Sequence, residues 1–283
     1  MSNNPLKQYF RQPALYMRLP TLGKWYDTAD IELNENYELP IYGLSALDDI
    51  MLNTPDALLN GQALENVIKN CVPNVKNVKA LMVPDLEAIF LGMKIATNNG
   101  KYEIERKCPK CSADINFEVN CYHLLDRTTY IEEADTKIQF DENLIIEVSP
   151  YTFEMRQMFM QRQFEEQQTL RLIDEQNKDL DNFEKAKILG ESVERLSLIT
   201  FNLVSMSIKS ITMLKENIVV TDQSQIAEWL VNISKNQADI IIEGVNQLNT
   251  LGPMREVDAQ CDKCQHTWKE TLNFDPVSFF GKR

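Results

Sequence analysis

The eight residues KCPKCSAD, at positions 107–114, contain the first of two CxxC pairs in the chain. Cys108 and Cys111 are separated by two residues, a spacing that lets both sulfurs reach one metal ion at about 2.3 Å. The same spacing is typical of redox-active thiol pairs. The pair is therefore either half of a metal site or a complete redox site, and the other cysteines must decide between these possibilities.

A second CxxC pair, Cys261 and Cys264, lies near the other end of the chain in the stretch QCDKCQHTW. Both pairs stand between segments that alternate polar and apolar residues, YEIERK and DINFEV around the first pair, REVDAQ and TWKETL around the second. This alternation predicts two β-hairpins with the cysteines at their tips. In zinc ribbons, two such hairpins face each other and supply four thiolates to one tetrahedral ion. The sequence therefore predicts one structural zinc ion per chain, bound by Cys108, Cys111, Cys261 and Cys264.

Three other interpretations of the cysteines compete with this one. Redox-active pairs are expected at a helix N-terminus, which lowers the thiol pKa, rather than at a hairpin tip. Two disulfides would need an oxidising compartment, and we expect no signal peptide from the N-terminal residues. Two unrelated thiol pairs would make the shared flanking pattern a coincidence. His266 and Cys121 are spare candidate ligands, and His123 is interpreted as an ordinary surface or core histidine.

The distance between the two pairs departs from the usual zinc ribbon. Residues 112–260, 149 in all, lie between them, against about 15–20 in a usual ribbon. Loop-closure entropy grows only logarithmically with length, so a folded insertion is tolerated. The predicted fold class is α+β, mostly helical, with a split zinc-ribbon-like β-knuckle pair and an inserted helical bundle. The predicted domains are an extended N-terminal arm (1–26), a mixed α/β domain with the first knuckle (27–148), an inserted helical domain (149–252), and the second knuckle with a C-terminal strand or tail (253–283).

Capping signals and periodicity place the individual elements. The stretch TKIQFDENLIIEVSP predicts a hairpin that turns at DEN, and Asp222 predicts the cap of a late helix. Asn99-Gly100 predicts the end of the helix in VPDLEAIFLGMKIATNNG. Three earlier helices are expected to begin at Ser45, at Thr54-Pro55 and near residue 62, the last with Cys71 on its apolar face.

The segment at 190–214 is expected to be a helix that is apolar on more than one side. Part of it keeps a seven-residue seam, formed by Leu196, Ile199, Leu203 and Met206. Leu198, Phe201, Val204, Ile208 and Ile211 cover the remaining face. Such a helix is either the centre of the protein's own bundle or a surface shared with a partner or a second subunit.

Composition argues against several classes of function. The 29 basic and 42 acidic residues give a net charge of −13, which disfavours nonspecific binding to nucleic acid and to anionic membranes. The chain has 9 glycines and no GxGxxG or GxxxxGK[ST] motif, so we expect no nucleotide cofactor. With 2 histidines and no nucleophile–base pair, we expect no enzyme. No apolar run reaches the roughly 18 residues that a membrane helix needs.

Residues 1–26 differ from the rest of the chain. They carry four basic residues, no acidic residue, five interleaved aromatic residues and three prolines. The prolines disfavour a long helix, so an extended basic and aromatic arm is expected. The arm either packs on its own domain or wraps around a partner.

Residues 39–77, LPIYGLSALDDIMLNTPDALLNGQALENVIKNCVPNVKN, and the continuation through IATNNG to CPKC carry a family resemblance. Over about residues 10–125 the chain resembles the tail baseplate hub protein family of T-even-like contractile-tailed bacteriophages. The resemblance implies a non-enzymatic virion component of the tail baseplate, made in the host cytoplasm. Its partners would be other phage tail and baseplate proteins, and a homo-oligomer stays open. The alternative is a tail or hub assembly chaperone that acts with the tape measure protein and is absent from the mature particle.

Overall fold

A computed structural model of the chain confirms the predicted α+β class. The structure describes residues 5–52, 61–176, 182–274 and 279. The helix predicted to begin at Thr54-Pro55 therefore falls outside the described residues.

The chain divides into two compact units. The outer unit consists of Met1–Tyr130 together with Leu251–Arg283, and the inserted unit consists of Ile131–Thr250. The outer unit is therefore discontinuous in sequence, with one CxxC pair in each of its two parts.

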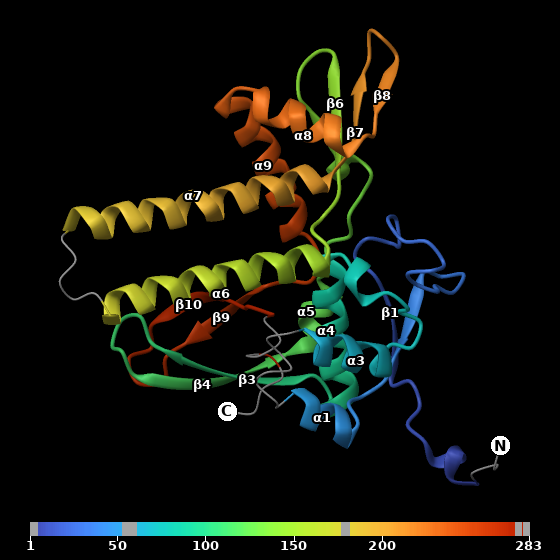
Figure 1. The fold of residues 1–283 in the computed structure, drawn as a ribbon. Coiled ribbons are helices and arrows are strands. Elements are labelled where there is room, and N and C mark those ends of the chain that lie inside the picture. The colour runs from blue at the N-terminus through green and yellow to red at the C-terminus, as the bar shows by residue number, and fades with distance from the viewer. Residues whose placement is uncertain (1–4, 53–60, 177–181, 275–278, 280–283) are drawn as a thin grey trace. The chain divides into compact units, whose positions relative to one another are not determined.

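In its described residues, the outer unit contains three separate two-stranded antiparallel sheets, β1-β2, β3-β4 and β9-β10 (Figure 1). Before the first CxxC pair, its elements are the 3-10 turn η1 (Pro5–Tyr9), β1 (Leu15–Arg18), β2 (Glu38–Ile41), α1 (Ala46–Leu52), α3 (Gln62–Cys71), the 3-10 turn η2 (Val78–Ala80), α4 (Val83–Asn98) and β3 (Lys101–Lys107). After it come β4 (Asp114–Asn120), α5 (Cys121–Asp126), β9 (Glu256–Gln260) and β10 (Thr267–Thr271).

Helix α4 is central to the outer unit because it has almost no polar face. Every residue from 83 to 93 is buried, including the carboxylates of Asp85 and Glu87, so the helix is enclosed on all sides. The helix contacts β1, β2, β3 and α5. It ends where the sequence predicts, because Asn99 adopts the left-handed conformation (φ 58°) and Gly100 follows with φ 75°.

The C-terminal segment adds aromatic packing to the same core. Phe279 is 1% exposed, and its ring centroid lies 6.4 Å from that of Phe90 in α4 and 4.7 Å from that of Tyr102 in β3. Its carbonyl oxygen accepts a hydrogen bond from Lys94 Nζ at 2.7 Å. A residue near the end of the chain thus contributes to the core beside α4.

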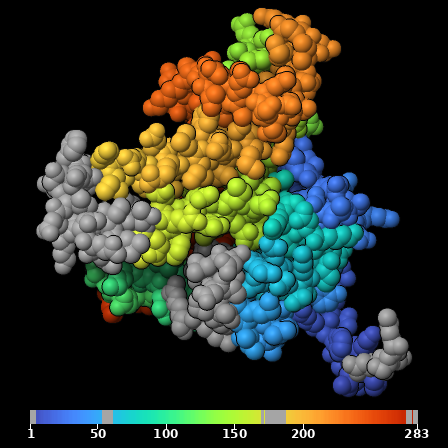
Figure 2. Space-filling view, in the orientation of Figure 1, coloured from blue at the N-terminus to red at the C-terminus, as the bar shows by residue number. Residues whose placement is uncertain are grey.

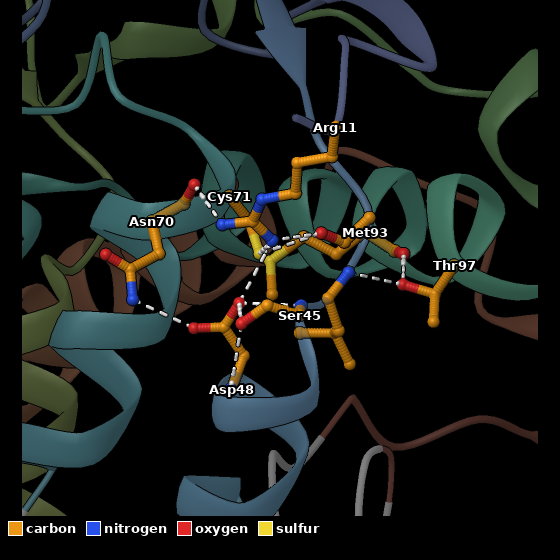
Figure 3. Close-up of polar contacts among 9 residues, drawn as sticks. Arg11, Ser45, Asp48, Asn70, Cys71, Met93 and Thr97 are labelled. Carbon is orange, nitrogen blue, oxygen red and sulfur yellow. Dashed lines mark hydrogen bonds and ion pairs between the residues drawn. The ribbon is translucent and has the colours of Figure 1, made fainter. Parts of the chain in front are cut away.

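Arg11 anchors the N-terminal segment (Figure 3). Its guanidinium donates to the carboxylate of Asp48 at 3.0 Å, to the carbonyl oxygen of Asn70 at 2.9 Å, and to the Gly43 carbonyl. Asp48 is fully buried and also accepts hydrogen bonds from the side chains of Ser45 and Asn70, at 2.6 and 2.8 Å. Burial acts to raise the pKa of Asp48, but these hydrogen bonds and the Arg11 charge outweigh burial and lower it. The predicted helix start at Ser45 is confirmed, since α1 begins at the next residue.

The following residues form part of the outer unit's core. Strand β1 pairs with β2, and Met17 and Leu19 are 4% and 0% exposed. Of the two interpretations of the N-terminal arm, packing on its own domain therefore applies from Arg11 onward. Residues 5–10 are exposed and project from the outer unit, in dark blue in Figure 2.

A second buried carboxylate holds the end of this segment. Asp85, in the first turn of α4, accepts hydrogen bonds from the backbone N–H and hydroxyl of Thr21, at 2.9 and 2.6 Å. It also accepts one from the phenol of Tyr26 at 2.5 Å, and that phenol accepts one from the Met82 N–H at 2.7 Å. Burial raises the pKa of Asp85 to about 6, although its hydrogen bonds act in the opposite direction.

The inserted unit combines a four-stranded antiparallel sheet, in the order β5-β6-β7-β8, with a set of helices (Figure 1). Its strands are β5 (Lys137–Gln139), β6 (Leu144–Val148), β7 (Ile208–Met213) and β8 (Ile218–Val220). The helices are the 3-10 turn η3 (Ala134–Thr136), α6 (Phe153–Gln176), α7 (Asn182–Ser207), α8 (Gln223–Asn232) and α9 (Lys235–Thr250). Asp222 caps α8 as predicted, accepting from the N–H groups of the second and third residues that follow it.

The prediction of one helix over 190–214 is wrong at its C-terminal end. Helix α7 ends at Ser207 and the chain continues as β7, which pairs with β6. The ladder is irregular here: Val148 opposes Ile208, and Ile146 opposes Ile211, so β7 has one extra residue between them. This bulge buries both isoleucines although they are three residues apart, a spacing that resembles a helix face.

The inserted unit begins at Ile131, whereas the sequence analysis began the insertion at residue 149. The difference comes from the hairpin β5-β6, which was predicted but assigned to the preceding domain. Because β6 pairs with β7, the hairpin belongs with the helices that follow it. The DEN turn forms as expected, with Asp141 accepting hydrogen bonds from the N–H groups of Asn143 and Leu144.

Helices α6 and α7 contact each other, and α7 also contacts α8 and α9. The carboxylate of Glu166 in α6 accepts hydrogen bonds from Ser192 and Arg195 in α7. These contacts agree with a helix central to its own bundle, yet large apolar side chains stay exposed along the pair. They are Met158, Met160, Phe164, Leu189, Val193, Leu198 and Met206. Among the described helices, none is both long and apolar enough to cross a membrane.

Candidate metal centre

The first CxxC pair lies at the tip of the β3-β4 hairpin. The two strands pair along their whole length, from Lys101 opposite Asn120 to Lys107 opposite Asp114. At the tip, the N–H of Cys108 donates to the carbonyl oxygen of the residue five positions later at 2.9 Å. The N–H of Ser112 donates back to the Cys108 carbonyl at 2.8 Å, and Ser112 has φ 57°. This tight turn brings both cysteines to one side of the knuckle.

The second knuckle repeats this geometry residue by residue at the tip of the β9-β10 hairpin. The N–H of Cys261 donates to the carbonyl oxygen of His266 at 2.9 Å, and the N–H of Gln265 donates to the Cys261 carbonyl at 2.8 Å. Gln265 has φ 57°, the value that Ser112 has in the first knuckle. The two strand–knuckle–strand units predicted from the sequence are confirmed, down to the left-handed residue that follows the second cysteine.

The two knuckles bring their four sulfurs together. The Sγ atoms of Cys108 and Cys264 are 3.7 Å apart, as are those of Cys111 and Cys261, and all four lie within 4.8 Å of one another. Four sulfurs at about 2.3 Å from one tetrahedral ion would be about 3.8 Å apart. A disulfide would need about 2.05 Å, and all six cysteines are free. The donor set and its spacing therefore fit a tetrahedral thiolate-bound metal.

Backbone amides and crowding set the proton affinity of these sulfurs. Burial acts to raise the pKa of the Cys108 thiol, but hydrogen bonds from the N–H groups of Cys111 and Lys110 outweigh it and lower the pKa to about 7. The His266 N–H acts to lower the pKa of Cys264, but burial and the three neighbouring thiols raise it to about 12. The thiol of Cys108 thus loses its proton more readily than that of Cys264.

Apolar side chains and one ion pair join the knuckles around the sulfurs. Cys108 and Cys261 are 1% and 0% exposed, and they pack with Ala113, Ile115, Phe117 and Trp268. Arg106 in β3 donates to the Glu270 carboxylate in β10 at 2.6 Å. The same carboxylate accepts a hydrogen bond from Trp268 Nε1 at 3.1 Å. The ion pair links the two hairpins without a metal ion.

The spare ligands named from the sequence do not join the cluster. Among the described residues, the four cysteines are the one group of three or more ligand side chains close enough to share an ion. His266 stacks its ring on Trp268 at 5.9 Å between centroids, and His123 is exposed. Cys121 and Cys71 are fully buried elsewhere, and burial raises the pKa of each to about 12.

Within the outer unit, the segments that flank the insertion join at a backbone pair that the sequence did not reveal. Thr129 and Gly252 exchange two N–H···O bonds, at 2.8 and 3.0 Å. Gly252 has φ 112°, and a Cβ atom there would lie 3.1 Å from Pro84 Cβ, so glycine fits this position best. The two parts of the outer unit are thus joined both by the cysteines and by this backbone pair.

Comparison with known proteins gives one match. A family model described as T4 bacteriophage base plate protein matches residues 44–281. The match covers all four cysteines and the whole inserted unit, and it reaches well beyond the resemblance noted over residues 10–125. No curated protein matches the chain, and no solved structure matches it.

Proposed function

The chain belongs to the T4 bacteriophage base plate protein family, and we propose that it is a structural subunit of the baseplate hub of a contractile phage tail. In this proposal one structural zinc ion holds its shape, and the protein acts through contacts with other tail and baseplate proteins. The observation that carries the baseplate role is the family match over residues 44–281, and the four-sulfur cluster, built from two knuckles on either side of the inserted unit in sequence, supports the zinc ion.

The four cysteines would hold the ion, and four protein ligands leave no coordination position open for water. When bound, the ion would supply four metal–sulfur bonds and offset half of the four negative charges of the thiolates. The protein's own groups contribute as well: amides of the first knuckle point at Cys108, and the Arg106–Glu270 pair links the hairpins. Such a centre suits a part whose shape must persist within an assembly.

The surface supports a role in protein–protein contact. Tyr9 and Phe10 are 77% and 55% exposed on the outer unit, and the α6–α7 pair exposes the apolar side chains named above. A large contiguous patch of exposed apolar side chains marks an interaction surface, and we propose that the side chains along α6 and α7 form one. We place these surfaces against neighbouring tail proteins.

Metal analysis tests the zinc centre. Protein purified under reducing conditions, without added metal, should contain about one zinc ion per chain. A Cys108→Ser variant should lose it, whereas Cys121→Ala, which changes a buried cysteine outside the cluster, should keep it. Folded wild-type protein that contains no zinc would refute this part of the proposal.

Quantitative mass spectrometry of purified mature particles tests the place in the tail. A baseplate hub subunit should be present at a fixed ratio to known tail proteins. Its presence in unfinished hubs together with its absence from mature particles would favour the alternative, an assembly chaperone acting with the tape measure protein.

A further inference from the structure

Two close sulfur–sulfur contacts join opposite knuckles of the metal centre. The Sγ atoms of Cys108 and Cys264 are 3.7 Å apart, and so are those of Cys111 and Cys261. The partners are 156 and 150 positions apart along the chain. A disulfide bond is about 2.05 Å long, so the sulfurs of each pair would have to approach by roughly 1.7 Å. The two contacts use each of the four sulfurs once, so two disulfides can form together.

Contacts that need no metal ion link the two hairpins beside these sulfurs. Arg106 in β3 donates to the carboxylate of Glu270 in β10 at 2.6 Å. The buried cysteines of both knuckles pack in one apolar cluster, which includes Ile115 and Phe117 from the first hairpin and Trp268 from the second. Loss of the ion would therefore leave the sulfurs of opposite knuckles beside one another.

Each of these pairs combines an accessible cysteine with a buried one. Cys111 is exposed, whereas its partner Cys261 is 0% exposed. Cys264 is partly exposed, whereas its partner Cys108 is 1% exposed. Reversible thiol oxidation begins at a solvent-accessible sulfur, and a neighbouring cysteine then resolves the product to a disulfide. The cluster thus supplies an accessible sulfur and a resolving sulfur in each pair.

We propose that the four cysteines form a redox-sensitive clasp with two closed states. In reducing surroundings they bind zinc, and in oxidising surroundings, once the ion is lost, they form the disulfides Cys108–Cys264 and Cys111–Cys261. A disulfide within one CxxC pair would leave the knuckles unjoined. A disulfide between the knuckles cross-links distant positions, which removes more conformational entropy from the unfolded chain and so stabilises the outer unit more. The zinc-bound state rests on the proposed function, whereas the disulfide state rests on the geometry of the sulfurs alone.

A peroxide is the oxidant that the disulfide state requires. The Cys111 sulfur attacks one oxygen of hydrogen peroxide, the O–O bond breaks, and a water molecule leaves behind a sulfenic acid, S–OH. The Cys261 sulfur then attacks the sulfenic sulfur, the S–O bond breaks, and a second water leaves with the proton of the attacking thiol. Two thiols thus give two electrons to one peroxide molecule and yield one disulfide and two waters. The same steps, begun at Cys264 and completed by Cys108, form the second disulfide.

Disulfide mapping of the full-length protein tests the pairing. Metal is removed with EDTA in the presence of a reductant, the reductant is removed without oxygen, and hydrogen peroxide is added. After alkylation in denaturant and digestion without reductant, mass spectrometry should find the two predicted pairs of cysteine peptides linked. Cys71 and Cys121, both fully buried outside the cluster, should be alkylated as free thiols. Disulfides within each CxxC pair, a random mixture of pairings, or four free thiols in the cluster would each overturn the proposal.

Hydrogen exchange tests whether the disulfides hold the outer unit closed. Peptides from β3, β4, β9 and β10 should exchange faster in the reduced, metal-free protein than in the zinc-loaded protein, and oxidation should restore the lost protection. Peptides from the inserted unit, which contains none of the four cysteines, are the internal control. An oxidised protein whose knuckles exchange as fast as those of the reduced, metal-free protein would refute the clasp.

A variant checks that the two disulfides form independently. Cys111→Ser should keep the Cys108–Cys264 disulfide and lose the other, whereas the matched control Cys121→Ala should form both. Loss of both disulfides in Cys111→Ser, with the wild type forming both, would contradict the pairing. These results are read on metal-free protein, so their failure is distinguishable from failure of the metal centre, which the zinc content of untreated protein decides.

Discussion

Two anchors hold distant segments together in the outer unit, and they rely on opposite chemistry. The four-cysteine cluster joins the two knuckles through sulfurs that fit an external cation. The N-terminal segment is held instead by two buried carboxylates, Asp48 and Asp85, whose partners are all supplied by the chain. The comparison teaches that a repeated, spaced motif reveals the first kind of anchor in a sequence. The second kind consists of single, ordinary residues and becomes visible in the folded structure.

Removing one sulfur should have the largest effect of any single change in either anchor. Cys261→Ser should abolish stoichiometric zinc binding and destabilise the outer unit by roughly 3–5 kcal/mol or more, since structural zinc contributes about 10–16 kcal/mol in small domains. Hydrogen exchange at increasing urea, read on peptides from β3, β4, β9 and β10, measures the loss. Peptides from the inserted unit serve as an internal control, and an unchanged outer unit would contradict the prediction.

Removing Arg11, the cation that pairs with Asp48, should destabilise the outer unit. Arg11→Ala leaves Asp48 buried with fewer partners, and losing the partner of a buried charge costs about 3–5 kcal/mol. Arg11 is 34% exposed at its side chain, so we expect the lower end, about 3 kcal/mol. Urea unfolding of the outer unit measures it, with exposed Lys7→Ala as the matched control. Zinc content should stay at about one per chain, and its loss would show that the two anchors are coupled.

The second carboxylate gives the N-terminal anchor a pH dependence. Burial raises the pKa of Asp85 to about 6 in the folded state, above its value of about 3.9 when unfolded. The folded state therefore binds the proton more tightly. The contribution of Asp85 to the free energy of unfolding is therefore complete below about pH 4. It is lost as the pH rises through 6, and the loss is roughly 2–3 kcal/mol at most.

Asp85→Asn should remove this dependence of the free energy of unfolding on pH. Urea midpoints of the outer unit, measured for both proteins between about pH 4.5 and 7, isolate the contribution of Asp85, because all other titrating groups are shared. Parallel pH profiles for the two proteins would contradict the assignment.

The ion pair between the knuckles should matter least. Arg106 and Glu270 are 34% and 19% exposed at their side chains, and partly exposed pairs contribute about 0–1 kcal/mol. Arg106→Ala should therefore cost less than about 1 kcal/mol and leave one zinc per chain. Lys101→Ala, which removes an exposed pair with Glu118 on the same hairpin, is the control. A zinc affinity lowered by Arg106→Ala alone would show that the pair also orients the ligands.

The knuckles could be predicted from the sequence because each pattern that indicates them depends on only a few neighbouring residues. The cysteine spacing, the flanking alternation and the caps at Ser45 and Asn99 all act within a few residues. The closeness of the two cysteine pairs followed from a chemical requirement, since one tetrahedral ion needs four ligands.

Other features depended on contacts that no local pattern encodes. The bulge in β7 gave Ile208 and Ile211 a helix-like spacing, and the helical prediction failed there because pairing with β6 decides the conformation. The pairing of β6 with β7, which groups the hairpin β5-β6 with the helices that follow, likewise depends on residues far apart in the chain. Asp85, Tyr26 and Thr21 meet through packing against α4, and nothing in their spacing indicates it.

Because the outer unit is discontinuous in sequence, its two knuckles are synthesised at different times. At about 5–20 residues per second, the 149 residues between the knuckles take roughly 7–30 s to synthesise. Throughout this time the first pair of thiols lacks its partners, while the inserted unit is already complete at Thr250. We therefore expect nascent chains halted beyond this point to carry a folded inserted unit and an open outer unit. The outer unit would then close only after the second knuckle has been synthesised.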